Sequence, residues 1–424
     1  MSNPIHSTSA KSVLPMLAMR GLATGLCAGC VVGLLRLSHD RAAARVALWL
    51  EEWREVWWTV PIWFGVLVAL AVILRRIVRE AALIRGSGRL SFTWWRVLLA
   101  KFLGSWLALF GGLALGREGP SIQMGGAVGA GFHALWRPAA PHALTGSPYV
   151  VAGAVAGLAA AFGAPAAGVL FAFEEMKSRR DTSLIVAACA SAIGAHLMIR
   201  IVFGMGRILP FAGFEAPPLS SFWIVALEGA VFGVLGVGYN KTLLWLHDRE
   251  AGQTLIPDRW RALPPLLLAG CLALFAPLLI GGGESLIIFV GEHDVALKTL
   301  ILLLAFKYLF AQYSTVASIP GGLLMPILCL GALWGRLWAE LPVSALAAHG
   351  LASGSVQPYV LFGMVSYFAA TVRAPLTGIV LVTEMSGTYT CLPGSLLAGL
   401  IACKVANLLH CPPVYDSLKE RIRL

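Results

Sequence analysis

The residues best suited to do chemistry are Arg117 and Glu118, which lie in the run Gly116-Arg117-Glu118-Gly119-Pro120. Apolar stretches at 97–115 and 127–136 flank this run, so the two ionisable side chains lie at or near membrane depth. Ionisable groups are costly there and are usually functional. Glycine lets backbone N–H groups face a ligand, and proline suits the first turn of a helix. We therefore predict a broken helix whose N-terminus forms an anion site, at which the Glu118 carboxylate competes with the anion.

The composition predicts an all-α integral membrane protein. Of the 424 residues, 58% are hydrophobic and only 12% are charged, whereas a soluble domain carries about 25% charged residues. The 46 glycines and 23 prolines indicate many tilted, interrupted helices. Most Lys and Arg residues lie in short polar breaks or in the tails, as the positive-inside rule places them. The net charge of +11 therefore predicts no nucleic-acid partner.

An internal repeat predicts two related halves. The segment Ala164-Pro165-Ala166-Ala167-Gly168 and the segment Ala374-Pro375-Leu376-Thr377-Gly378 are 210 residues apart, and in both a glutamate follows the proline by nine residues. A Gly/Pro break precedes each copy, at 116–120 and at 321–326. Paired breaks in two halves indicate a transporter with inverted repeats and a binding site near the bilayer midplane.

The domain prediction follows from this repeat and from the basic residues in both tails, which favour cytosolic ends. We expect a cytosolic N-terminal tail at 1–18, a first transmembrane repeat at 19–203, a connecting loop at 204–221, a second transmembrane repeat at 222–411, and a short cytosolic tail at 412–424 without a regulatory domain. Within the first repeat we expect a span at 21–37, an interfacial amphipathic segment at 38–55 and a second span at 60–74 that ends at Arg75 and Arg76.

Several motifs together resemble the CLC family of chloride channels and chloride/proton antiporters, in its prokaryotic form. The run at 116–120 is similar to that family's signature, and Gly322-Leu323-Leu324-Met325-Pro326 resembles its G-x-F-x-P loop with Leu324 in place of Phe. The two Ala-Pro segments also match. Further similarity comes from Trp94-Trp95-Arg96-Val97-Leu98, from Lys101 and from Tyr415, which matches the family's pore tyrosine.

The resemblance implies a multi-pass homodimer in the lipid bilayer of a prokaryotic inner membrane, with one chloride path per subunit and no cofactor or metal. It implies that Glu118 is the gate: ionised, it fills the outer anion site, and protonated, it swings away and admits chloride. The implied chloride ligands are the Ser87 hydroxyl, the Leu323 and Leu324 amides and the Tyr415 hydroxyl, supported by Gly116, Arg117, Gly119, Pro120, Gly322, Pro326 and Lys101.

Proton coupling stays open at this point. The serine loop is shortened after Gly88, and the residues at 203–207, where the inner proton acceptor is expected, contain no acid. We therefore expect chloride transport, gated by Glu118, without strict proton coupling. The alternatives are a chloride/proton antiporter with a water-mediated inner route, with Glu228 or Glu284 as a replacement relay, and a fluoride/proton exchanger.

An enzyme is not predicted. A nucleophilic serine needs a base, and Gly86-Ser87-Gly88 has no nearby intramembrane histidine. Zinc-type ligand spacing is also missing from the sequence. Structural roles are the simplest interpretation of Glu174 and Glu384, and Glu175 is expected at the membrane interface.

Overall fold

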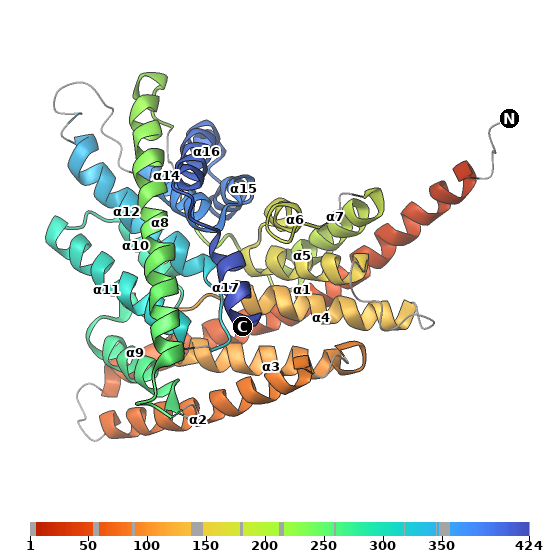
Figure 1. Cartoon of the computed structure of the whole chain (residues 1–424), viewed down its shortest axis with the longest axis horizontal. Coiled ribbons are helices and arrows are strands. Elements are labelled where there is room, and N and C mark those ends of the chain that lie inside the picture. Colours follow the sequence, from red (N-terminus) through yellow and green to blue (C-terminus); the bar gives the residue numbers. More distant parts are fainter. Residues whose placement is uncertain are drawn as a thin grey trace. The chain divides into compact units, whose positions relative to one another are not determined.

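The computed structural model describes residues 6–53, 59–86, 90–136, 147–178, 181–211, 216–257, 260–317, 319–344, 346 and 357–423 (Figure 1). The described residues are predominantly helical, as the composition predicts. They form two compact units. Unit 1 comprises Met1–Arg41, Ile77–Trp106 and Glu118–Gly206, and unit 2 comprises Ala42–Arg76, Leu107–Arg117 and Arg207–Leu424. The predicted boundaries of the two transmembrane repeats, 19–203 and 222–411, stay a prediction.

Unit 1 is built around α5, which packs against α4, α6 and α7. Its core is rich in alanine, with Ala156, Ala159 and Ala160 of α5 packed near Ala188 and Ala192 of α7. Small side chains let helix backbones approach closely, which is how helices associate inside membranes. Its helices are part of α1 (His6–Trp53), most of α3 (Leu90–Phe110), α4 (Glu118–Trp136), α5 (Pro148–Phe162), α6 (Pro165–Glu174) and α7 (Thr182–Leu197), which a π-helical turn (Met198–Val202) extends.

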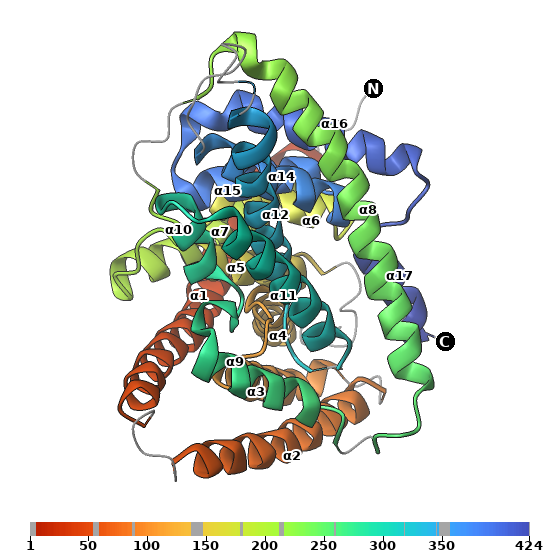
Figure 2. The ribbon, with the colours of Figure 1, turned by 90° about the vertical axis from the view of Figure 1, so that its left-hand side faces the viewer.

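Unit 2 is centred on α14, which packs against α8, α12, α15 and α16. Figure 2 shows α8 as one long helix through this unit. The helices of unit 2 are most of α2 (Thr59–Gly86), α8 (Phe222–Gly252), α9 (Leu263–Phe275), α10 (Glu284–Glu292), α11 (Leu297–Val316), α12 (Leu324–Trp338), α14 (Gln357–Val372), α15 (Pro375–Ser386), α16 (Leu392–Leu408) and α17 (Val414–Arg423).

The two Ala-Pro segments adopt the same local structure, which confirms the repeat at the level of the backbone. Ala164 precedes α6 with φ −121° and ψ 81°, and Ala374 precedes α15 with φ −119° and ψ 70°. In both, proline opens the helix. The residues before them, Gly163 and Arg373, both have a left-handed backbone, with φ of 66° and 67°. Arg373 holds this uncommon conformation while its side chain donates to Asn407 Oδ1 at 2.9 Å.

Equivalent glycine contacts join the helix after each Gly/Pro break to the next long helix. In unit 1, Gly125 of α4 and Gly153 of α5 each face the other's carbonyl oxygen, so no Cβ fits at either position. In unit 2, Gly331 of α12 and Gly363 of α14 face each other in the same way. The repeat therefore extends to how the helices pack.

Gly125→Ala is expected to destabilise the protein by about 3 kcal/mol, because the added methyl group meets backbone that cannot yield. Gly126→Ala is the matched control. A Cβ on Gly126 lies 3.8 Å from its nearest neighbour, which is ordinary contact. Thermal unfolding of both variants in detergent checks this difference, and equal midpoints would contradict the packing argument.

Two helices extend beyond the expected spans. The segment 38–55 was expected to be amphipathic and interfacial, and in the structure α1 runs without a break from His6 to Trp53. Arg75 and Arg76 were expected to close a membrane span, and the helix α2 itself continues past them to Gly86. An arginine near a membrane border does not end a helix, because its long side chain can reach the interface.

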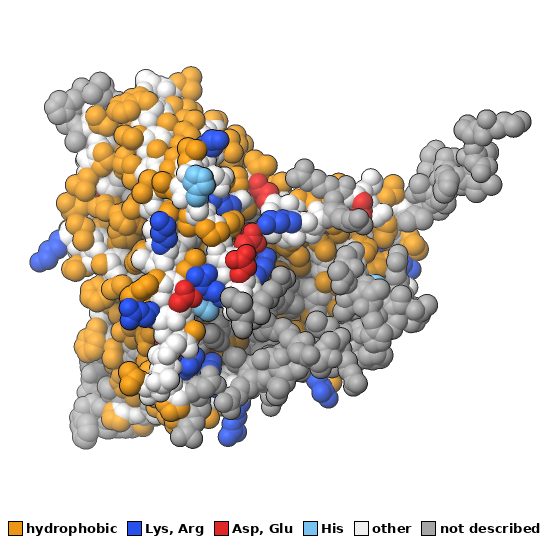
Figure 3. Space-filling view, in the orientation of Figure 1, with side chains coloured by type: hydrophobic (Ala, Val, Ile, Leu, Met, Phe, Trp, Pro, Cys, Tyr) orange, Lys and Arg blue, Asp and Glu red, His pale blue; other side chains and the backbone are white. Residues whose placement is uncertain are grey.

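The described residues include six helical segments long and apolar enough to cross a membrane. These are Leu14–Arg45, Thr182–Val202, Leu219–Gly252, Leu297–Val316, Leu324–Val343 and Tyr389–Leu408. Figure 3 shows that hydrophobic side chains cover much of the described surface on one face. Large apolar side chains are exposed along α8 and α11, including Trp223, Leu227 and Val234 on α8 and Leu302, Phe306 and Leu309 on α11. Such faces suit contact with lipid, so the chain is a multi-pass integral membrane protein.

Candidate anion site

The two Gly/Pro breaks are joined directly through their backbones. The Gly116 amide donates to the Gly322 carbonyl at 2.8 Å, and the Gly322 amide donates to the Gly116 carbonyl at 2.7 Å. Both glycines stand two residues before a helix, α4 in the first case and α12 in the second. A Cβ at the neighbouring Gly321 would lie 2.6 Å from Leu115 Cβ, so the close approach depends on glycine.

The N-terminus of α12 is formed by two residues predicted as anion ligands. Leu324 is the first residue of α12 and Leu323 is its N-cap, and both are buried. The first backbone N–H groups of a helix have no intrahelical acceptor and carry the positive end of the helix dipole. Pro326 lies buried in this first turn, where its missing N–H costs nothing. The partial positive charges of these N–H groups favour an anion, so the site does not need a fully charged cation.

Glu118 is the first residue of α4 and its side chain is fully buried in the structure. Gly119 and Pro120 follow it in the first helical turn. A carboxylate at a helix N-terminus is stabilised by the dipole, so this position suits either the Glu118 carboxylate or another anion in its place. Lys101, a further residue of unit 1, is also buried, on α3. Ser87 lies outside the described residues, so its predicted role stays a prediction.

Arg117, the residue before Glu118, forms an ion pair with Glu284. Its Nη2 donates to Glu284 Oε1 at 2.5 Å. Glu284 opens α10 directly after Gly283, whose φ of 103° suits only glycine. This ion pair gives Glu284 a structural partner. It also ties the chain just before Glu118 to α10.

Lys307 of α11 holds the loop before α10 in place. Its side chain is fully buried, and its Nζ donates to the carbonyls of Leu279 at 2.9 Å and Gly281 at 2.7 Å. The Gly281 amide in turn donates to the Gly112 carbonyl at 3.0 Å. Lys307 therefore supports, through this loop, the segment that leads to Gly116.

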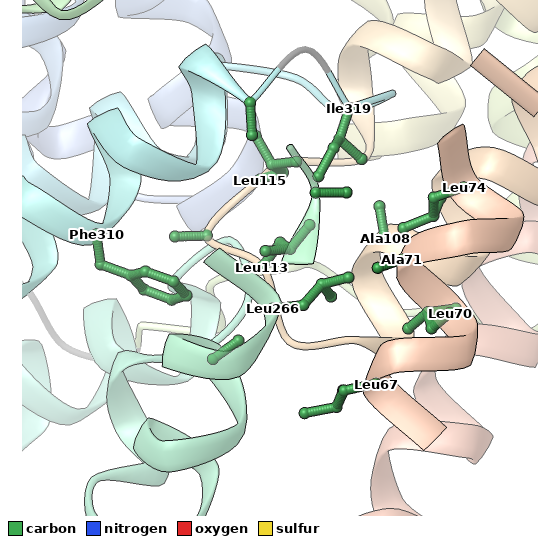
Figure 4. Close-up of a cluster of buried hydrophobic side chains, with 14 of the residues drawn as sticks. Leu67, Leu70, Ala71, Leu74, Ala108, Leu113, Leu115, Leu266, Phe310 and Ile319 are labelled. Atoms are coloured by element: carbon green, nitrogen blue, oxygen red, sulfur yellow. The ribbon is translucent and has the colours of Figure 1, made fainter. Parts of the chain in front are cut away.

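An apolar cluster also holds the segment that leads to Gly116. Figure 4 shows Leu113 and Leu115 packed among Leu67, Leu70 and Leu74 of α2, Leu266 of α9 and Phe310 of α11. The Ala114 amide, between the two leucines, donates to Ser314 Oγ at 3.2 Å. The fixed geometry of the break thus depends on residues distant in sequence.

Tyr415 lies in the first turn of α17 and is partly exposed. The chain leading to it is fixed by three hydrogen bonds. Arg373 Nη2 donates to the Cys411 carbonyl at 2.9 Å, Asn240 Nδ2 donates to the Pro412 carbonyl at 3.4 Å, and Ser417 Oγ donates to the Pro413 carbonyl at 3.0 Å. These contacts restrict where the Tyr415 hydroxyl can lie.

The far end of α17 is bound to α8. Arg421 forms a two-pronged ion pair with Asp248, with N–O distances of 2.7 and 3.0 Å. This hydrogen bond raises the pKa of Arg421 above its usual value. Because Asp248 is exposed and Arg421 is partly exposed, the pair contributes little to stability, and its main effect is to orient α17.

Comparison with known proteins decides the family. The family model described as "Voltage gated chloride channel" matches residues 79–407. The chain belongs to this family. The exchange transporter "H(+)/Cl(-) exchange transporter ClcA" of Vibrio campbellii is 34% identical over 93% of this chain and 87% of its own length. The protein with the same name from Klebsiella pneumoniae is 30% identical over 97% of this chain and 89% of its own.

Solved structures agree on the fold of this chloride channel family. A slow cyanobacterial Cl−/H+ antiporter has a TM-score of 0.80 at 26% identity, covering 95% of this chain and 98% of its own. A CLC-type fluoride/proton antiporter has a TM-score of 0.66 at 18% identity, covering 98% and 99%, which shows the fold alone. The predicted CLC-type fold is therefore confirmed, and the family transports chloride, as the sequence motifs predicted.

Sequence reasoning did not identify two buried groups. Lys307 lies in an apolar helix, and its only signal was that an unpaired lysine in such a span is rare. Glu175 was expected at the membrane interface, but only 8% of it is exposed, at the C-terminal end of α6. The inner acid was expected at 203–207, and Glu175 lies outside that range.

Proposed function

We propose that this protein exchanges chloride for protons across the membrane. The observation that carries the proposal is the buried Glu118 carboxyl at the start of α4, two residues after the Gly116–Gly322 bridge. One carboxyl that either occupies an anion site or takes up a proton couples the two ions. The exchange activity named for the Vibrio campbellii and Klebsiella pneumoniae relatives supports coupled exchange over the uncoupled transport that the sequence led us to expect.

The chloride ligands that we propose are the Leu323 and Leu324 amides and the Tyr415 hydroxyl, with Ser87 as a further ligand. Amides and hydroxyls donate hydrogen bonds to an anion without the attraction of a full charge, so chloride can both bind and leave. The position of Leu323 and Leu324 at the start of α12 supports this assignment. The restrained chain before Tyr415 supports it too.

Proton transfer needs a second acid, because an isolated charge cannot cross the apolar core. We propose Glu175 for this step. Glu118 and Glu175 are the two carboxylates of unit 1 that are buried among the described residues. This assignment replaces the expectation of an acid at 203–207, and it supplies the inner group whose apparent absence had favoured uncoupled transport.

The decisive experiment measures both ions at once in liposomes that contain the purified protein. A chloride gradient is imposed while the membrane potential is clamped near zero. Proton movement against its own gradient, in a fixed ratio to chloride, supports exchange. Chloride flux without proton movement would overturn the proposal in favour of uncoupled conduction. Replacing chloride by fluoride tests the remaining alternative.

Glu175→Gln is expected to lower proton transport to background while chloride still crosses, because a neutral amide cannot pass on a proton. Glu174→Gln is the matched control, since Glu174 is the neighbouring residue and is less buried. The control should keep both fluxes and their ratio. Unchanged proton transport in Glu175→Gln would remove Glu175 from the path.

We also propose that the protein is a homodimer in the bacterial inner membrane, with both chain ends in the cytosol. The basic residues of both tails support this orientation. Labelling of a cysteine placed in either tail from outside intact cells would contradict it.

A further inference from the structure

Glu228 on α8 is a buried carboxyl that the transport mechanism above does not use. Its exposed fraction is 0%, and neither carboxyl oxygen has a hydrogen-bond partner among the described residues. Glutamate is almost never fully buried unless it is paired. Glu228 belongs to unit 2, whereas Glu118 and Glu175 belong to unit 1.

Tyr359, at the start of α14, is a second buried polar side chain of this part of unit 2. Its exposed fraction is also 0%, and its hydroxyl likewise has no hydrogen-bond partner in the described part of the chain. A protonated carboxyl carries one O–H donor and one C=O acceptor, and a tyrosine hydroxyl can both donate and accept. In the structure the two side chains do not hydrogen-bond to each other, but a protonated Glu228 carboxyl and the Tyr359 hydroxyl have complementary donors and acceptors.

The helices around this pair are closely packed. Gly229, next to Glu228, approaches α16 so closely that a Cβ would lie 2.6 Å from the Ala398 carbonyl oxygen. Gly335 of α12 faces the Tyr359 carbonyl oxygen. Phe232, one turn after Glu228 on α8, forms an edge-to-face contact with Trp338 of α12 at a centroid distance of 6.2 Å. The pair thus lies where α8, α12, α14 and α16 meet.

The charged groups on neighbouring helices are engaged elsewhere in the described structure. Lys307 of α11 donates to backbone carbonyls, and Arg421 of α17 is bound to Asp248. Arg336 of α12 is bound to Asp294 and Glu340. Lys404 of α16 is exposed. The other titratable side chains of the α16 segment are the thiols of Cys391 and Cys403, and α11 adds Tyr308, bound to Thr242. None of these supplies a counter-charge to Glu228 within the described residues. An ionised carboxylate without a donor in this place would be strongly destabilising.

We propose that Glu228 and Tyr359 form a proton-binding site that gives transport a second acid-dependent step, separate from the Glu118 gate. The bound proton lets the four helices close around the pair. Its release leaves a carboxylate that needs water, which requires α8 to separate from α14 and α16. The C-terminal part of α12 packs on Tyr359, and α12 begins at Leu324 in the proposed anion site. The separation of α8 from α14 and α16 therefore shifts α12 and changes the anion site. The link to transport rests on the proposed function, but the proton site itself does not.

The first test observes the proton directly. Infrared spectra of the protein in lipid, at neutral pH and with hydrogen–deuterium exchange, report protonated carboxyl groups by their C=O stretch. Glu228→Gln is expected to remove one such band, and Glu292→Gln, which changes an exposed carboxylate, is expected to remove none. A spectrum unchanged by Glu228→Gln overturns the site. Glu228→Leu, which removes the buried polar group, provides a second variant if the amide disturbs folding.

The second test measures chloride flux against pH in the Glu118→Gln background. We expect a weak residual rise of flux at acid pH, and we expect Glu228→Gln to abolish it. If the infrared band disappears while the residual pH response stays, the proton site stands and its link to transport is overturned. If wild-type protein carries no proton-coupled flux, the proposed function fails, and the infrared result still decides the fate of the site.

Discussion

Replacing Glu118 with Gln is expected to stop proton transport while chloride continues to flow, the largest functional effect that we foresee. Gln has the same size and cannot ionise, so it imitates the protonated side chain and does not compete as an anion. The proton path loses its outer acid at the same time. Acid activation should fall to the weak component assigned to Glu228, because acid ordinarily increases flux by protonating the gate.

Simultaneous recording of proton and chloride flux in liposomes checks this expectation. Glu118→Asp is the control, because it keeps a carboxyl that can be protonated and should therefore keep a steep pH response. A Glu118→Gln protein that still pumps protons, or that responds to pH as the wild type does, would contradict the gate assignment.

Lys307→Met is expected to cause the largest loss of stability, about 2 to 5 kcal/mol. The substitution keeps the length of the side chain but leaves the buried carbonyl of Leu279 and the partly buried carbonyl of Gly281 without their donor. The loop that carries Gly281 also supports Gly112, so we expect slower chloride flux in the molecules that remain folded.

Thermal unfolding in detergent and flux per folded protein measure these two effects. Lys298→Met is the matched control, because Lys298 lies on the same helix and is exposed. It should unfold at the wild-type temperature. Equal loss in both variants would show that the charge of α11, and not the bond to the loop, is what matters.

The sequence predicted those features that depend on neighbouring residues. The paired Ala-Pro segments predicted two related halves, and both segments start a helix in the structure, because proline at the first helical position restricts the local backbone wherever it occurs. The broken helices at Glu118 and Leu324 followed from the glycines and prolines on either side of them in the same way.

Features that depend on tertiary partners were not predicted. The Arg117–Glu284 ion pair joins residues 167 positions apart, and no local pattern records it. The burial of Glu175 depends on how α6 packs. The glycine contacts of Gly125 with Gly153 could have been suspected from the abundance of small residues, but only the packed helices show which glycines meet.

The pairing of Gly116 with Gly322 has a consequence for how the protein is made. At about 5 to 20 residues per second, the ribosome needs about 10 to 40 s to synthesise the chain from one glycine to the other. Until then, the backbone at Gly116 lacks its hydrogen-bond partner. The segments of unit 2 that precede Glu118 also lack the later helices against which they pack. During this interval the peptide groups of Gly116 lack the hydrogen bonds that Gly322 supplies in the folded protein. A mutation that weakens this bridge is therefore expected to lower the yield of inserted protein before it alters the transport rate of the molecules that mature.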